Sequence, residues 1–98
     1  MQLINYLVEF LGTFVFLYII LESAGYGNSQ PFVIAIGLLS AILLFGSVSG
    51  GHFNPAVTTM VWAKGDSNVE PIGYVLAQVA GGLAAYKVHQ YITVTKNA

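Results

Sequence analysis

Three long apolar stretches dominate the chain, at about residues 3–21, 31–48 and 71–94. Each is close to the ~20 residues that an α-helix needs to cross the hydrocarbon core of a bilayer. Polar and glycine-rich segments separate them, and Pro31 and Pro71 begin the second and third stretches. Proline suits the first turn of a helix, because its missing N–H would have no partner there. The pattern therefore predicts three transmembrane helices.

The segment at 49–63, between the second and third stretches, has a different pattern. Glycines precede Phe53 and favour irregular backbone. Asn54 is a good helix cap and Pro55 a good first helical residue, which predicts a short helix over 54–63. About ten residues at ~1.5 Å each cover ~15 Å, half of a ~30 Å hydrocarbon core. We expect a re-entrant loop and half-helix; the alternative is an exposed loop followed by an interfacial helix.

Irregular backbone at membrane depth has a further consequence. Lipid cannot satisfy free N–H and C=O groups, so such backbone occurs there only where protein buries it or where it lines a watery cavity. A re-entrant segment at 49–63 would thus imply a wet path through the membrane.

Composition supports the lipid bilayer as the main partner. Of 98 residues, 56% are hydrophobic and 7% charged, far from the roughly 25% charged content of soluble domains. The first stretch makes a poor signal peptide, since no basic residue precedes it and Glu9 interrupts it. The chain has no arginine and a formal net charge of -1, so we expect no nucleic-acid partner.

Other classes of function find little support in the sequence. There is no cysteine and there are only two histidines, so no metal site and no cofactor is expected. No paired carboxylates, activated nucleophile or phosphate-binding loop indicates an enzyme.

The sequence Ser-Gly-Gly-His-Phe-Asn-Pro-Ala-Val-Thr at 49–58 resembles the first of the two Asn-Pro-Ala signatures of the aquaporin, or major intrinsic protein, family. Residues 8–14 and 73–82 resemble the family's first and third spans. The resemblance covers nearly the whole chain, but only the first half of a usual member, which carries two repeats in inverted orientation. It implies an all-α integral membrane protein, residues 1–98 forming a single repeat of three transmembrane helices and one re-entrant half-helix.

The resemblance also implies a function. A passive channel for water or small uncharged solutes such as glycerol is expected, in a plasma or inner membrane. Because the chain supplies one Asn-Pro-Ala corner, its pore would need an antiparallel homodimer with facing corners, possibly four pairs and eight chains in total. The alternatives are a holin-like or structural small membrane protein, or an inactive half-channel that needs a different partner.

Site residues follow from the same resemblance. The pore signature consists of Asn54, Pro55 and Ala56, and the Asn54 amide would donate to passing solute. The backbone carbonyls expected to line the pore belong to Gly50, Gly51, His52 and Phe53. The constriction positions are Ile34, Ile42, Gly51 and Val57; most family members have an arginine at the position of Val57, so an apolar constriction is expected here.

Two further features concern structural support. Glu9 lies well inside a predicted span, where an acid needs a partner. The resemblance implies that it supports the irregular loop near residues 50–53, so Glu9→Gln should preserve transport and Glu9→Leu should impair folding. Small residues recur every four positions on the third stretch and predict close helix packing: Gly73, Ala77, Gly81 and Ala85.

Overall fold

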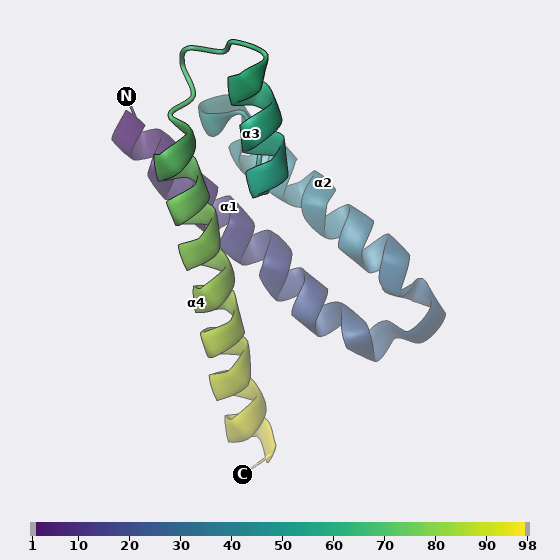
Figure 1. Cartoon of the computed structure of the whole chain (residues 1–98). Helices are drawn as coiled ribbons and strands as arrows, with labels where there is room; N and C mark the ends of the chain where they lie inside the picture. Colours follow the sequence, from purple (N-terminus) through teal and green to yellow (C-terminus); the bar gives the residue numbers. More distant parts are fainter. Residues whose placement is uncertain (1, 98) are drawn as a thin grey trace.

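The structure, a computed structural model, describes residues 2–97, which contain helices and no strand. Long helices run back and forth along the bundle, and one short helix lies near one end of it (Figure 1). The helices are α1 (Gln2–Ser23), the 3₁₀ helix η1 (Ala24–Ser29), α2 (Gln30–Ser49), α3 (Pro55–Ala63) and α4 (Pro71–Asn97). The expectation of an all-α chain is therefore confirmed.

Helix α1 is central, because it packs against both α2 and α4, whereas α3 packs against α4. The reversal from α1 to α2 is tight. Gly27 adopts a positive φ of 54° within η1, a conformation that glycine reaches without a steric penalty. The buried Ser23 hydroxyl donates to the carbonyl of Ile20 at 2.5 Å and accepts from Gln30 Nε2 at 3.2 Å. These bonds join the end of α1 to the start of α2.

The helix starts agree with the local signals in the sequence. Pro31 lies in the first turn of α2, and Pro71 is the first residue of α4. The carboxylate of Glu70 accepts hydrogen bonds from the backbone N–H groups of Ile72 and Gly73 at the start of α4. Asn54 caps α3, its Oδ1 accepting from the backbone N–H of Ala56 at 2.7 Å.

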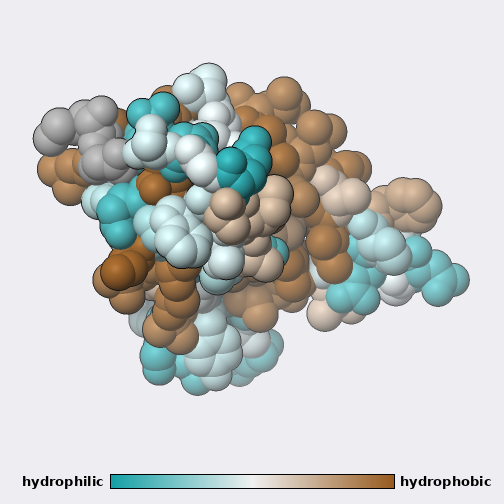
Figure 2. Space-filling view, turned by 45° about the horizontal axis from the view of Figure 1, so that its top comes forward, coloured by the Kyte–Doolittle hydropathy of each residue, from teal (hydrophilic) through white to brown (hydrophobic). Residues whose placement is uncertain are grey.

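Many of the buried side chains are polar, and many of the large apolar side chains are exposed. The largest fully buried side chains among the described residues are Tyr74, Glu9, Thr13, Thr58 and Ser23. Large apolar side chains are exposed along the long helices, and Figure 2 shows them covering much of the visible face. Exposed apolar surface on this scale marks contact with lipid or with other protein.

Within residues 2–97, one continuous helical stretch, Leu3–Ser49, is long and apolar enough to cross a membrane by length and composition. It contains α1 and α2, of 22 and 20 residues, joined by η1. Helix α4 has 27 residues but is less apolar, and it lies outside that stretch.

Candidate functional site

The site is a backbone corner between α2 and α3. Helix α2 ends at Ser49 and is capped by Gly50, which has a φ of 96° and donates its N–H to the carbonyl of Gly46 at 2.9 Å. Gly51 follows with a φ of 66°, and Phe53 with a φ of 52°. The chain then turns into α3 at Asn54. The glycines thus provide the left-handed backbone that the reversal requires.

Phe53 is unusual, because a bulky residue with positive φ is strained by roughly 1–3 kcal/mol. Its side chain is 3% exposed, and its ring fills the space where a Cβ on Gly12 of α1 would lie. Its backbone N–H donates to Glu9 Oε1 at 2.9 Å. Packing on α1 and this hydrogen bond therefore hold the strained residue in place.

Glu9 connects α1 to the corner. Its carboxylate is fully buried and accepts four hydrogen bonds. Oε2 accepts from the Ser49 hydroxyl at 2.7 Å and from the His52 backbone N–H at 3.1 Å. Oε1 accepts from Phe53 N–H at 2.9 Å and from Gln78 Nε2 at 2.9 Å. The structure thus places Glu9 against the loop backbone that the sequence analysis associates with it, at His52 and Phe53.

A second set of buried polar groups ties the corner to α3 and α4. Gln78 Nε2 also donates to the Thr58 hydroxyl at 2.8 Å. That hydroxyl lies 2.9 Å from His52 Nδ1. The Tyr74 hydroxyl donates to the carbonyl of Ser49 at 2.7 Å. The sequence analysis assigned no supporting role to Ser49, Thr58 or Tyr74.

Some hydrogen-bonding groups of the corner have no partner among the described residues. Asn54, Pro55 and Ala56 are exposed, and Asn54 Oδ1 is engaged with Ala56 N–H. No hydrogen bond between described residues uses the Asn54 amide N–H groups. The same holds for the carbonyl oxygens of residues 50–53. The amide N–H groups of the exposed Asn54 are therefore open to an outside molecule.

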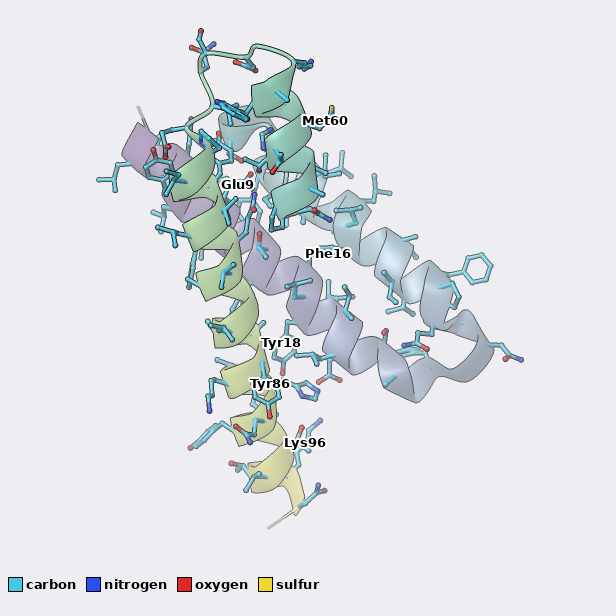
Figure 3. All side chains as sticks on the ribbon, in the orientation of Figure 1. Glu9, Phe16, Tyr18, Met60, Tyr86 and Lys96 are labelled. Carbon is cyan, nitrogen blue, oxygen red and sulfur yellow. The ribbon has the colours of Figure 1, made fainter. Side chains whose placement is uncertain are left out.

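A groove of about 560 Å³ begins at this corner and runs between α1 and α4. Its lining is mostly apolar and comes from α1, from residues 53–55 and from α4. Figure 3 shows Phe16, one of its residues, beyond the N-terminal end of α3 and away from Met60. Three polar side chains line it, Thr13, Asn54 and Gln78. Thr13 and Gln78 each have one buried side-chain oxygen without a hydrogen-bond partner among the described residues.

The constriction positions are only partly brought together. Ile42 lies next to Gly51, where an added Cβ would meet Ile42 Cγ1 at 3.6 Å. Val57 is half-buried on α3, three residues after Asn54. Ile34 lies eight residues before Ile42 on α2, which is ~12 Å along the helix axis. A ring within one chain therefore cannot include both isoleucines at one level.

Two of the four small residues predicted to pack α4 closely, Gly73 and Gly81, lie directly against α1. A Cβ on Gly73 would collide with the Tyr6 ring, and one on Gly81 would lie 2.6 Å from the Phe10 carbonyl oxygen. Ala85 is fully buried and Ala77 half-buried.

The described residues hold no group of three or more side chains able to bind a metal ion.

A helical bundle with much exposed apolar surface and a buried polar corner fits contact with lipid. The family model described as Major intrinsic protein matches residues 2–98. The chain belongs to the major intrinsic protein family.

Individual relatives agree with this assignment. The chain is 41% identical over 88 residues to the glycerol uptake facilitator protein-like 6 of Lactiplantibacillus plantarum, covering 83% of this chain and 40% of the relative. It is 43% identical over 91 residues to aquaporin Z of Photorhabdus laumondii, covering 82% and 39%. The chain thus spans about two fifths of the length of these relatives. No solved structure matches it.

Proposed function

We propose that two copies of this chain, inserted in opposite orientations in a plasma or inner membrane, form a passive channel for water and small uncharged solutes such as glycerol. The observation that carries the proposal is the corner at Asn54, where buried polar groups fix irregular backbone and where α3, a helix of nine residues, begins. Nine residues cover ~13.5 Å, less than half of a ~30 Å core. Two such helices end to end would span most of it.

The relatives support a channel and a second half. Two are named as an aquaporin and a glycerol uptake facilitator, and both are more than twice as long as the matched region. An opposed second copy would provide a region related to the first by a two-fold axis in the membrane plane, the homo-oligomeric equivalent of an inverted repeat. Four such pairs, eight chains in all, would form the complete assembly.

The path would pass the Asn54 corner. Carbonyls of residues 50–53 would accept hydrogen bonds from solute, while the Asn54 amide would donate, so a neutral solute exchanges its hydrogen bonds stepwise. Each α3 N-terminus carries about half a positive charge. Two of them facing each other would repel cations and excess protons at the midpoint while leaving neutral solutes unaffected.

The selectivity constriction would require both copies. Because Ile34 lies ~12 Å from Ile42 along α2, each ring would combine Ile42, Gly51 and Val57 of one copy with Ile34 of the other. Such a ring is apolar and has no fixed cation. It would admit a wider range of small neutral solutes than a ring with an arginine.

Reconstitution of the purified chain alone tests the proposal. Stopped-flow swelling should show water and glycerol flux above that of empty liposomes, while an ionic dye or a potential-sensitive probe should show no ion leak. Collapse of the membrane potential would favour a holin-like protein instead. Absence of any flux from a folded, dimeric chain would indicate a half-channel that needs a different partner.

A further inference from the structure

Helix α4 carries an apolar face that no other helix covers. Within residues 2–97 it packs against α1 and α3 and not against α2, and Figure 1 shows it at an edge of the bundle. Large side chains recur on its free face at alternating spacings of four and three residues, between 49% and 69% exposed, and we call this set the α4 seam: Ile72, Leu76, Val79, Leu83 and Tyr86. The spacing is the heptad pattern of helices that pack along each other.

We propose that the α4 seam is the surface on which two opposed copies of the chain meet, with their α4 helices packed antiparallel across the two-fold axis. The inference rests on the proposed pairing, and it adds the helix and the side chains that make the contact. Lipid is the alternative occupant of an apolar face, because hydrocarbon chains are as apolar as leucine. Three features of the seam favour a second copy over lipid.

The first feature is the depth of the seam's centre. Val79 lines the groove that begins at the corner, and its neighbour Gln78 donates to Thr58 in the first turns of α3. Helix α4 thus passes the corner near Val79. Ile72 and Tyr86 lie seven residues to either side of Val79, ~10.5 Å along the helix. A two-fold axis in the membrane plane at this depth therefore places Ile72 of each copy opposite Tyr86 of the other.

The second feature is the shape of the two ends of the seam. An apolar hollow of about 240 Å³ lies at the start of α4, lined by Pro71, Ile72, Val75 and Leu76. Tyr86, at the other end, is 50% exposed. Antiparallel pairing brings the Tyr86 ring of each copy to the hollow of the other. An aromatic side chain that fills an apolar pocket is a common anchor of protein interfaces.

The third feature is charge. Glu70 and Lys87 are exposed next to the two ends of the seam, and neither belongs to an ion pair within residues 2–97. The Lys87 ammonium lies 5.9 Å from the centre of the Tyr86 ring, beside the seam. Glu70 lies nine residues before Val79 and Lys87 eight after it. Antiparallel pairing therefore brings each Lys87 to the level of the other copy's Glu70, within ~1.5 Å along the axis, and makes two ion pairs.

Cross-linking tests the seam, because the chain has no cysteine of its own. Val79→Cys lies at the axis and should give a disulfide-linked dimer on oxidation in membranes. Ile72→Cys alone should not, because its two thiols would lie ~21 Å apart along the axis, whereas a disulfide joins Cα atoms ~6 Å apart. Ile72→Cys co-expressed with a differently tagged Tyr86→Cys should link the two chains. Leu43→Cys, at a position 75% exposed on α2, measures random collision.

The yields decide between the occupants. Yields no higher than that of Leu43→Cys, both from Val79→Cys and from the mixed pair, would overturn the seam and leave this face to lipid. Self-linking of Ile72→Cys would overturn it as well, since that link requires parallel helices. Swelling assays on the same preparations separate the two proposals: flux without seam cross-links overturns the seam alone, and seam cross-links without flux overturn the channel alone.

The ionic contact is tested by Lys87→Glu, which sets like charges against each other at both ends of the seam. The dimer dissociation constant in detergent should rise on the order of fivefold, and by less at high salt. Lys96→Glu makes the same change in net charge beyond the end of the seam, and should leave the constant near the value of the parent chain. Equal effects of the two substitutions would remove the contact between Glu70 and Lys87 from the interface.

Discussion

At the scale of single residues, the carboxylate of Glu9 determines the shape of the corner. Both of its oxygens face donors only, with two hydrogen bonds to each. In Glu9→Gln, one oxygen becomes an NH₂ group that points at donors, so about two charge-assisted hydrogen bonds are lost, roughly 3–6 kcal/mol. The structure therefore revises the expectation that Gln would preserve transport. We expect Glu9→Gln to lower the thermal unfolding temperature in detergent and to reduce flux.

Glu9→Leu provides the comparison. It leaves the Ser49 hydroxyl, two backbone N–H groups and Gln78 without their acceptor, at about 1–3 kcal/mol each. We expect this variant to be less stable than Glu9→Gln, and to fail to accumulate as folded protein. Equal stability of the two variants and the parent chain would show that the carboxylate does not hold the corner.

The packing of the Phe53 ring against Gly12 leads to a second prediction at this scale. Gly12→Ala introduces a Cβ where the Phe53 ring lies, so the ring, and with it the strained backbone, must move. Overpacking of this kind destabilises by about 1–3 kcal/mol. Gly25→Ala is the control, since a Cβ there meets no atom within 4 Å. Thermal unfolding in detergent should separate the two variants; similar transitions would argue against tight packing at Gly12.

At the scale of helices, the approach of α1 and α4 depends on one glycine more than on its neighbour. A Cβ on Gly81 would lie 2.6 Å from the Phe10 carbonyl oxygen, whereas one on Gly82 would lie 2.9 Å from Leu17 Cδ1. Backbone cannot yield without moving the helix, but the end of a leucine side chain can rotate. Gly81→Ala should therefore destabilise by about 1–3 kcal/mol and Gly82→Ala by well under half of that. Unfolding by heat in detergent measures both, and a reversed order would contradict the packing.

The helices themselves were largely predictable from sequence, because their signals are local. Apolar length, proline at helix starts and the Asn54 cap all act within a few residues. The predicted stretches 3–21, 31–48 and 71–94 lie inside α1, α2 and α4, respectively.

The corner's support was harder to predict, since it depends on contacts between distant residues. Glu9 and Phe53 are 44 positions apart, and Glu9 and Gln78 are 69. A resemblance to the family indicated Glu9, but no local pattern indicates that Thr58 and Tyr74 complete the network or that Phe53 adopts a positive φ. The groove, too, exists only once α1, α4 and the corner are assembled.

At the scale of the whole molecule, the proposed constriction lacks a fixed cation, since the chain contains no arginine. Val57→Arg would place one in each ring of the pair, three residues after Asn54. A guanidinium narrows the opening and holds water strongly, so glycerol and urea flux should fall more than water flux. Stopped-flow swelling measures the flux of water, glycerol and urea, and gives the ratios of glycerol and urea flux to water flux. Unchanged ratios from an intact dimer would exclude Val57 from the constriction.

The opposed pairing makes a last prediction about topology. Lys64 lies on the side of the loop between α3 and α4, whereas Lys87 and Lys96 lie toward the other end of α4, so lysine bias is small and both orientations are allowed. Two added lysines on one side should fix the orientation. One variant carries Ala24→Lys and Asn28→Lys on η1; the other carries Ala63→Lys at the end of α3 and Ser67→Lys after it, and all four positions are exposed.

Each biased variant alone should lose flux, because opposed partners are no longer made. Co-expression of the two should restore it, and Asn28→Lys with Ser67→Lys, one lysine on each side, should behave like the parent chain. Labelling of a single introduced cysteine with an impermeant thiol reagent reports the orientation in each case. Full flux from a population shown to face one way would mean that the pore does not need an inverted copy, because a two-fold axis in the membrane plane cannot relate chains of the same orientation.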